Sequence, residues 1–393
     1  MIRSFPGKLF TAFESVIFIP VRNLSLGSSD CQKCSKKPRP LEPPWKILFF
    51  GNDYFSLESL KPLYAKLNTG TLVSCLEVVT SDKSLVKKFC EHENLLVHNW
   101  PLNASSIAGK FHVGMVVSFG HMIPKSVIDC FPLGCINVHS SILPKYRGAA
   151  PIAHAIMNGD FETGVTIMKI HPHRFDVGDI VRQYRVSISP EETSQELGQR
   201  LAVCGGQLLM ECLRDMPKCL QMTVAQPSDG VSYAPKLTPS MAKIDWQTSN
   251  ARHVYNMHRA LSHFFPLVTT WHGTILKLLD VRLDHKTRNA DTDSSSKISN
   301  PMAEVDASVS RKSALDFLNS DSSCRNEQSH SRSSANAGHV QFFRSVNVLK
   351  ISCRDDNVVV VNRMKINGKT ISASDFFNGY MSKRPKEQWR FGL

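Results

Sequence analysis

Apolar strand-like runs alternate with helical segments between residues 46 and 220, and this alternation most limits the folds open to the chain. Strands joined by helices usually lie parallel in one sheet, with the helices on its faces. The expected strands are 46–50, 73–80, 95–100, 113–119, 135–138, 165–170 and 180–187. The clearest helical segments are 56–67, 81–93, 150–158 and 193–216. The first half of the chain is therefore predicted to form an α/β domain with a parallel-rich sheet.

Asn137 and His139 lie two positions apart at the end of the fifth expected strand, so they point to the same face of the sheet. In open α/β sheets, ligands bind beyond the carboxyl ends of the strands. Asp176 follows the next strand, in a Gly-containing turn. An amide can hydrogen-bond a developing oxyanion, an imidazole can support it or move a proton, and a carboxylate can orient the imidazole. The three side chains together suit acyl chemistry.

Each of these residues also has an ordinary structural explanation. A strand-end Asn often bonds neighbouring backbone, a lone His is often a satisfied, half-buried residue, and Asp commonly stabilises turns. Taken singly, Asn137, His139 and Asp176 leave both explanations open. A nicotinamide enzyme is poorly supported, because Gly51 after the first strand is not followed by the further glycines of a dinucleotide fingerprint.

Longer motifs favour the functional explanation. They read Asn-Val-His-x-Ser-x-Leu-Pro at 137–144, Arg-Gly-Ala-Ala-Pro-Ile at 147–152, Thr-Gly-Val-Thr-Ile-Met at 163–168, Asp-x-Gly at 176–178, Ser-Tyr-Ala-Pro-Lys-Leu at 232–237, Ile-Asp-Trp at 244–246 and Ala-Ser-Asp-Phe-Phe-Asn at 373–378. This series resembles the formyltransferases that use 10-formyltetrahydrofolate, and is most similar to the methionyl-tRNA formyltransferases of mitochondrial type. The resemblance spans about residues 46 to 380, apart from one insertion.

The resemblance implies a two-domain enzyme. Its parts would be a Rossmann-like formyltransferase catalytic domain at 46–220, a linker at 221–240, and a C-terminal tRNA-binding domain at 241–393 with an OB-like β-barrel. The formyl group of 10-formyltetrahydrofolate would pass to the α-amino group of methionine on initiator methionyl-tRNA, for translation initiation in mitochondria. No metal is expected to take part.

The resemblance also implies roles for individual residues. Asn137 and protonated His139 would stabilise the oxyanion, and Asp176 would hold the imidazolium and help to pass a proton to the leaving nitrogen. A turn that resembles the folate-contacting turn of the family is made by Ser141, Ile142, Leu143 and Pro144.

The chain departs from the bacterial pattern in two places. The approach to Asp176 is one residue longer, and its Arg-Phe-Asp-Val-Gly order resembles mitochondrial members more closely. Bacterial relatives carry a long basic loop after the position of Thr80, whereas the segment 81–88 here is much shorter. No discriminator arginine can therefore be assigned, and Lys83, Lys87 and Lys88 are the candidates for phosphate contacts in this region.

Short strands predominate in the C-terminal part, at 268–271, 275–281, 349–353 and 358–361, with a hairpin at 362–370 and a helix at 248–261 before them. The whole chain has 47 Lys and Arg against 34 Asp and Glu, a net charge of +13, which suits a polyanionic partner. The basic residues proposed here for tRNA binding are Lys365, Lys369, Lys383, Arg384 and Lys386. A solvated basic tail is the competing explanation.

Residues 1–45 carry scattered Lys and Arg with few acidic residues, the pattern of a mitochondrial transit peptide or of a disordered leader. No apolar run approaches the ~18–20 residues of a membrane span, so no membrane anchor is expected. From the leader and the resemblance we expect a protein of the mitochondrial matrix, and we expect it to be a monomer. The Ser-rich segment 284–339 is predicted to be a disordered insertion. Of the 11 cysteines, only Cys31 and Cys34 form a CxxC pair, so neither a metal site nor a structural disulfide is expected.

Two other functions remain open from the sequence. One is a folate-dependent formyltransferase or hydrolase that acts on a nucleotide or sugar amine, against which the motifs at 232–237 and 373–378 argue. The other is a non-catalytic RNA-binding module that kept the fold, against which the intact Asn137, His139 and Asp176 argue.

Overall fold

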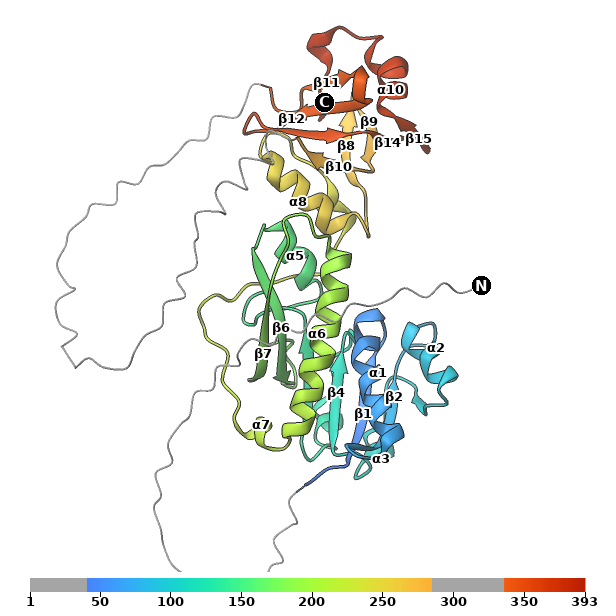
Figure 1. Cartoon of the computed structure of the whole chain (residues 1–393), viewed down its shortest axis with the longest axis vertical. Coiled ribbons are helices and arrows are strands. Elements are labelled where there is room, and N and C mark those ends of the chain that lie inside the picture. The colour runs from blue at the N-terminus through green and yellow to red at the C-terminus, as the bar shows by residue number, and fades with distance from the viewer. Residues whose placement is uncertain (1–40, 285–335, 393) are drawn as a thin grey trace, which may run out of the picture. The chain divides into compact units, whose positions relative to one another are not determined.

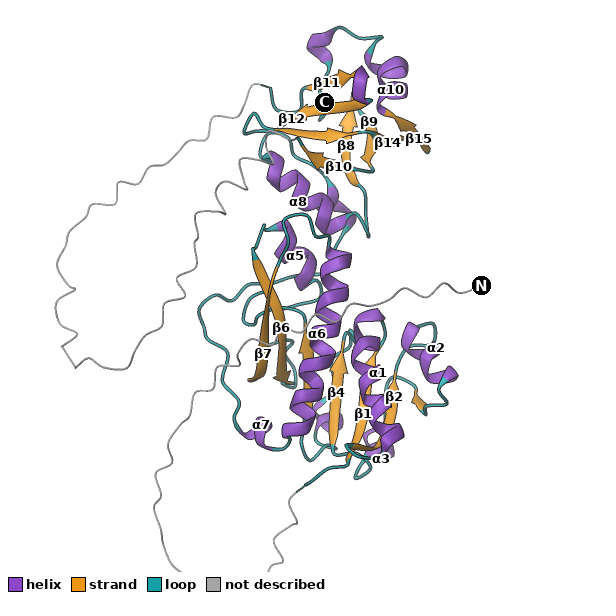
Figure 2. Cartoon of the chain, viewed as in Figure 1, coloured by secondary structure: helices purple, strands orange, loops and turns teal. Residues whose placement is uncertain are grey.

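The computed structural model describes residues 41–284 and 336–392. The expected leader therefore lies outside the described residues except for 41–45, and the expected insertion lies outside them except for its ends at 284 and 336–339. Helices and strands follow one another along the described chain as Figures 1 and 2 show. None of the helices in the described part is long and apolar enough to cross a membrane.

The first domain is built on a seven-stranded sheet in the order β3-β2-β1-β4-β5-β6-β7. Its strands are β1 (Trp45–Gly51), β2 (Val73–Val79), β3 (Val97–His98), β4 (Val113–Val117), β5 (Cys135–His139), β6 (Glu162–Lys169) and β7 (Ile180–Ser187). The pairs from β3 to β5 are parallel, whereas β6 runs antiparallel to both β5 and β7. The predicted α/β domain with a parallel-rich sheet is confirmed.

Helices cover both faces of this sheet, because successive side chains of its strands point to opposite sides. Ile47 and Phe49 of β1 belong to one hydrophobic core, and Leu48 and Phe50 to a second one on the other face. The helices are α1 (Tyr54–Thr69), α2 (Leu85–His92), α3 (Ala104–Ile107), α4 (Lys125–Ile128), α5 (Pro151–Met157), α6 (Ser194–Asp215) and α7 (Lys218–Gln221). In Figure 1, α1 and α6 lie side by side over the sheet, and they pack closely against each other.

The second domain consists of α8 (Ala251–Leu261) and two antiparallel sheets of four strands each. One sheet has the order β10-β13-β12-β11, and the other β15-β14-β9-β8. The strands are β8 (Leu267–Trp271), β9 (Thr274–Leu278), β10 (Val281–Leu283), β11 (Val340–Phe343), β12 (Val348–Ser352), β13 (Val358–Val361), β14 (Arg363–Ile366) and β15 (Lys369–Ser372). Short helical elements are η1 (Pro239–Ala242), η2 (Arg344–Val346), α10 (Ala373–Phe376), η3 (Phe377–Met381) and η4 (Lys386–Gln388). The antiparallel strand domain is confirmed, while a closed OB-like barrel stays a prediction.

Two strand predictions in this domain need correction. The run 275–281 is not one strand but β9 and β10, because Asp280 turns away to accept hydrogen bonds from the backbone N–H groups of Asn362 and Arg363, both at 3.0 Å. The sequence pattern also missed β11, which follows the Ser-rich segment directly.

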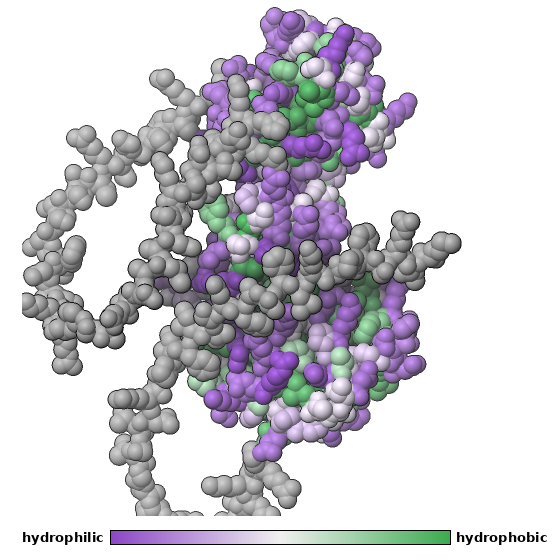
Figure 3. Space-filling view, in the orientation of Figure 1, coloured by the Kyte–Doolittle hydropathy of each residue, from purple (hydrophilic) through white to green (hydrophobic). Residues whose placement is uncertain are grey.

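Hydrophilic residues cover most of the described surface in the view of Figure 3.

Candidate active site

The three polar residues singled out from the sequence line one cavity of about 800 Å³. Asn137 and His139 come from β5, where the backbone is fixed between β4 and β6. Asp176 comes from the turn between β6 and β7, and its backbone has a positive φ of 55°. The structure therefore brings together an amide, an imidazole and a carboxylate from two separate segments.

Both nitrogens of His139 face oxygen atoms. Nε2 lies 2.9 Å from the backbone carbonyl oxygen of Tyr146, and Nδ1 lies 3.6 Å from Oδ1 of Asp176. A carbonyl oxygen only accepts hydrogen bonds, so Nε2 carries a proton in this arrangement. His139 and Asp176 are both largely buried, and the other carboxylate oxygen of Asp176 accepts a hydrogen bond of 2.8 Å from the N–H of Gly148.

The Asn137 side chain is half-buried and makes no hydrogen bond to any of the residues that the structure describes. Its neighbours on the sheet are Val116 of β4 and Met168 of β6, which offer no polar side chain. An amide held on a strand with its donor uncommitted is suited to bind an oxygen of a ligand in the cavity.

Gln226 fixes the turn that carries Asp176, and sequence reasoning missed it. Its amide nitrogen donates to the carbonyl oxygens of Asp176, at 2.9 Å, and Gly178, at 2.8 Å. Its amide oxygen accepts two hydrogen bonds from the Arg147 guanidinium, at 2.7 and 3.1 Å. Gln226 lies in the expected linker, so the linker helps to build the site. No short motif marks it, because its partners are 48–79 positions away.

The cavity wall combines apolar and polar side chains. Its apolar and aromatic part contains Phe119, Met122, Ile123, Pro151, Ile152, Leu237, Phe264 and Phe265. Its polar part outside the central three residues contains Asp53, Ser118, His121, Arg174 and Lys236. Flat apolar walls with a few polar groups are typical of sites for ring-containing small molecules.

Ser141, Ile142, Leu143 and Pro144 do not line this cavity. Two hydrogen bonds hold their turn: the Ser141 hydroxyl donates to the Lys145 carbonyl at 2.6 Å, and the Leu143 N–H donates to the hydroxyl of Thr166 on β6 at 3.1 Å. Ser141, Leu143 and Pro144 are buried. The turn therefore supports the loop that follows His139 and does not face the cavity.

The lysines after Thr80 lie around the start of α2. Lys83 and Lys88 are exposed, and Lys87 is partly buried with its Nζ 3.8 Å from Asp82. The loop before them is fixed by Asn52, whose Oδ1 accepts hydrogen bonds from the backbone and hydroxyl of Ser81, both at 2.8 Å.

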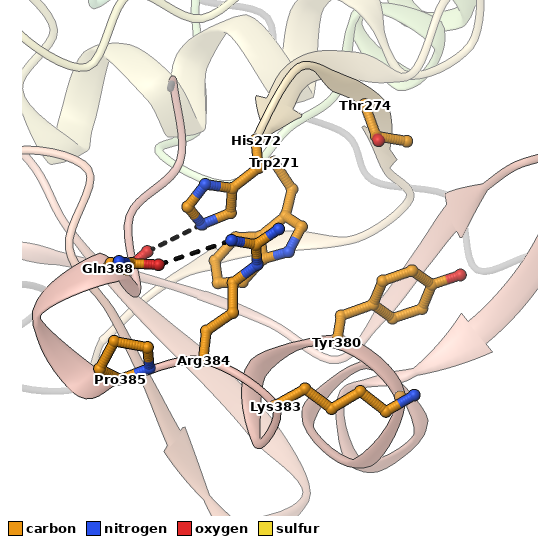
Figure 4. Close-up of a pocket in the computed structure, with 9 residues that line it drawn as sticks. Trp271, His272, Thr274, Tyr380, Lys383, Arg384, Pro385 and Gln388 are labelled. Atoms are coloured by element: carbon orange, nitrogen blue, oxygen red, sulfur yellow. Dashed lines mark hydrogen bonds between the residues drawn. The ribbon is translucent and has the colours of Figure 1, made fainter.

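The basic residues proposed in the second domain fall into two groups. Lys383 and Arg384 line a second cavity of about 480 Å³ together with Trp271, His272, Thr274, Gly379, Tyr380, Pro385 and Gln388 (Figure 4). Lys386 lies beside them in η4. In Figure 4, Gln388 links two of the other wall residues, since its carbonyl oxygen lies 3.1 Å from Nε2 of His272 and its amide oxygen 3.5 Å from the Arg384 guanidinium.

Lys365 and Lys369 form the second group, on the hairpin of β14 and β15. Lys365 lies directly opposite Lys277 of β9, and all three side chains are exposed. Like charges directly opposite each other on neighbouring strands destabilise a sheet. Lys277 was not singled out from the sequence, because the pairing that places it beside Lys365 joins segments far apart in the chain.

Within residues 41–284 and 336–392, no three His, Cys, Asp or Glu side chains come together in a way that could hold a metal ion. The cysteines of this part are free thiols. Burial raises the pKa of the thiols of Cys75, Cys90, Cys204 and Cys353, so they are protonated at neutral pH.

Comparison with known proteins assigns both domains. The family described as formyl transferase matches residues 80–213, and the one described as formyl transferase, C-terminal domain, matches residues 236–381. Mitochondrial methionyl-tRNA formyltransferase of Bos taurus is 35% identical over 347 residues, which are 86% of this chain and 78% of that protein. The Homo sapiens protein of the same name is 33% identical over 363 residues, 91% of this chain and 82% of its own length.

Solved structures share the fold at lower identity. WlaRD, a sugar 3N-formyl transferase crystallised in the presence of dTDP and 5-N-formyl-THF, has a TM-score of 0.53 at 17% identity, covering 84% of this chain and 100% of its own. An N-formyltransferase from Helicobacter canadensis, in complex with folinic acid and dTDP-3-aminofucose, has a TM-score of 0.52 at 16% identity, covering 81% and 98%.

Proposed function

This chain belongs to the formyl transferase family, and we propose that it formylates methionyl-tRNA. The formyl group of 10-formyltetrahydrofolate passes to the α-amino group of methionine on initiator methionyl-tRNA, in the mitochondrial matrix, for the initiation of protein biosynthesis. The observation that carries the proposal is the meeting of Asn137, His139 and Asp176 in one cavity, in a chain whose relatives of this name match it over most of its length.

The cavity suits the formyl donor. Phe119, Met122 and Ile123 offer an apolar wall to the flat pterin ring, and Asn137 offers an uncommitted amide beside it. Ser141, Ile142, Leu143 and Pro144 take an indirect part, since their turn fixes the course of the loop after His139. No step needs a metal ion.

The proposed proton transfers depend on the partners of the two His139 nitrogens, with Nε2 at the Tyr146 carbonyl and Nδ1 toward Asp176. When the methionine nitrogen attacks the formyl carbon, a new C–N bond forms and the carbonyl electron pair moves onto the oxygen. The Asn137 amide donates to that oxygen, and Nδ1–H of cationic His139 supports it. Asp176 stabilises the imidazolium while a proton leaves the attacking nitrogen. The Asp176 carboxylate takes up that proton and passes it to the leaving nitrogen of the folate, whose C–N bond breaks as the electron pair on the oxygen re-forms the carbonyl.

We propose that the basic side chains of the second domain hold the tRNA backbone. Exposed Lys365 and Lys369 with Lys277, and Lys383, Arg384 and Lys386 around the smaller cavity, offer charge at two neighbouring parts of that domain. Lys83, Lys87 and Lys88 are the corresponding candidates in the first domain, at the start of α2. One chain supplies every residue of the proposed sites, so we propose a monomer.

The proposed domain limits separate the residues proposed for catalysis from most of those proposed for tRNA binding. Residues 46–220 contain the catalytic residues, and 241–393 contain the basic set. The segment 221–240 is more than a tether, since Gln226 and Ser232 both bond to the catalytic loops. The proposed leader is the transit peptide at 1–45.

Turnover with defined acceptors tests the proposal. Purified protein is given 10-formyltetrahydrofolate with methionyl-tRNA, with free methionine or with a dTDP-amino sugar. We expect formylation of methionyl-tRNA alone. Transfer only to the sugar amine would support the other formyltransferase function, and tRNA binding without transfer would support an RNA-binding module.

Replacement of the amide tests the catalytic assignment. Asn137→Ala and His139→Ala are each expected to lower kcat by about 10²–10³, because loss of one oxyanion donor costs that much. Exposed Asn68 on α1 supplies the matched control, Asn68→Ala, which should transfer at the wild-type rate. A folded Asn137→Ala protein with a normal rate would refute the role of the amide.

A further inference from the structure

Tyr146 lies in the loop between β5 and α5, and its backbone forms a hydrogen bond with His139. Its carbonyl oxygen accepts the hydrogen bond from Nε2 of His139 at 2.9 Å. The backbone of Tyr146 has a positive φ of 63°. This conformation is uncommon for a bulky residue and persists only where the surroundings hold it.

Three hydrogen bonds hold Tyr146 in this conformation. Its phenol donates to Oδ2 of Asp160 at 2.8 Å and accepts from the amide of Asn158 at 2.9 Å. Its N–H donates to the hydroxyl of Ser232 at 2.9 Å. The side chain is buried, and burial raises the pKa of the Tyr146 phenol, so the hydroxyl remains a donor at neutral pH.

We propose that Tyr146 is a positioning residue that, anchored through Asp160, keeps the proton of neutral His139 on Nε2. Nδ1 is then left to face Asp176 and the reacting groups. This inference rests on the proposed function, because it concerns the imidazole that we place in the reaction. The carbonyl acceptor makes the Nδ1–H tautomer unfavourable, because that tautomer would set an Nε2 lone pair against a carbonyl oxygen.

The phenol anchor is the part of this arrangement that substitution can remove. Without the bond to Asp160, the loop can relax from its positive φ, and the carbonyl moves away from Nε2. His139 then loses its fixed tautomer and orientation. Binding of either substrate is expected to survive, because the Tyr146 side chain does not line the cavity.

Tyr146→Phe tests the anchor, with Asp160→Ala as the partner variant. Each should lower kcat for methionyl-tRNA by about tenfold, the scale of a small misplacement of a catalytic group, with KM for both substrates unchanged. The matched control is Lys145→Met. Lys145 also bonds Oδ2 of Asp160, at 2.6 Å, and its Nζ lies 5.0 Å from the centre of the Tyr146 ring, but its side chain is half-exposed and its removal leaves the bond between the Tyr146 phenol and Asp160 in place. This control should retain the wild-type kcat.

A spectroscopic readout separates positioning from simple support of the fold. In protein with ¹⁵N-labelled histidine, the His139 resonances are identified by their loss in His139→Asn. Neutral His139 should have its proton on Nε2 in the wild type and in Lys145→Met, and should show a mixture of tautomers in Tyr146→Phe. This measurement needs no substrate, so it decides the inference even if the wild type fails to formylate methionyl-tRNA. A proton on Nδ1 in the wild type, or an unchanged tautomer or unchanged kcat in Tyr146→Phe, would overturn it.

Discussion

Gly148 stands at a residue position where no side chain fits. Its φ is +126°, and a Cβ there would lie 2.6 Å from the carbonyl oxygen of Ala234. Its N–H donates to Asp176, and the same Ala234 carbonyl accepts the N–H of Ala150 at 3.1 Å. The linker thus packs directly on the loop that orients the carboxylate, and only glycine permits this approach.

Gly148→Ala is therefore expected to lower kcat by at least about tenfold, because the displaced N–H no longer orients Asp176. Gly70 supplies a matched control, since it also has a positive φ, +63°, but nothing lies within 4 Å of a Cβ there. Gly70→Ala should lower the unfolding temperature slightly and leave kcat unchanged. Equal kcat values in the two variants would refute the role of Gly148.

Among single residues, the sequence indicated the groups that we propose for the chemistry but not the groups that hold them in place. Asn137 and His139 could be predicted because a two-residue spacing on a strand puts them on one face. Tyr146 acts through a backbone carbonyl, which any residue possesses, so its identity gives no signal. Gln226 and Ser232 act across long separations in the chain, which no local pattern records.

Among the elements, α8 carries a histidine whose environment makes folding sensitive to acid. Burial lowers the pKa of His258, against the opposing effect of Asp280, and its Nδ1 has no hydrogen-bond partner among the described residues. The unfolded chain takes up this proton near the ordinary pKa of about 6.5, whereas the folded protein resists it. The unfolded state then binds more protons, so this group reduces stability as the pH falls below about 6.5.

Unfolding temperatures at about pH 7.5 and pH 5.5 test this, since that interval spans the ordinary histidine pKa. The drop on acidification should be smaller in His258→Gln than in the wild type. His92→Gln is the control, because the His92 side chain is exposed at the end of α2. A drop in His258→Gln as large as in the control would contradict the assignment.

Strand prediction was most successful where burial is two-sided. The run of β4 is apolar throughout, and that of β1 is apolar except for the exposed Lys46; both strands are buried on both faces. The predicted strand boundaries were wrong where a polar interaction interrupts a strand, as at Asp280. They were also wrong at the edge of the sheet, where β3 covers only Val97–His98 of the expected strand 95–100 and pairs with β2 alone. Such interactions depend on tertiary partners and have no local signature.

The Ser-rich insertion can be shortened, but the structure sets the limit of the deletion. Ala337 is fully buried, and the N–H of Gly338 donates to the carbonyl oxygen of Ser352 at 2.8 Å, so the removable segment ends at residue 335 and not at 339, the end of the insertion expected from the sequence. Replacing 285–335 by a short Gly/Ser linker should leave the unfolding temperature and kcat unchanged, since the replaced sequence has few core-forming residues. Extending the deletion through His339 should lower the unfolding temperature. A loss of stability with the shorter deletion would contradict the prediction.

For the whole molecule, catalysis and tRNA affinity are expected to be separable. Asn137, His139 and Asp176 belong to the first domain, here called the sheet domain. The basic residues Lys277, Lys365, Lys369, Lys383, Arg384 and Lys386 belong to the second domain, here called the strand domain. The opposed pair Lys277 and Lys365 stores repulsion that a bound phosphate would relieve. Neutralising this pair should therefore stabilise the free protein and weaken its complex with tRNA.

The triple variant Lys277→Gln, Lys365→Gln and Lys383→Gln tests this division. Its KM for methionyl-tRNA should rise, and the salt dependence of binding should become shallower by roughly one unit of slope for each phosphate that the protein no longer neutralises. Both kcat and the KM for 10-formyltetrahydrofolate should stay unchanged, because none of these three lysines lines the cavity that we propose for the formyl donor. The matched control neutralises Lys61, Lys110 and Lys125, which are exposed on the sheet domain. If the two triple variants have the same KM and the same salt slope, the charges of the strand domain serve only to solvate it, and tRNA must be held elsewhere.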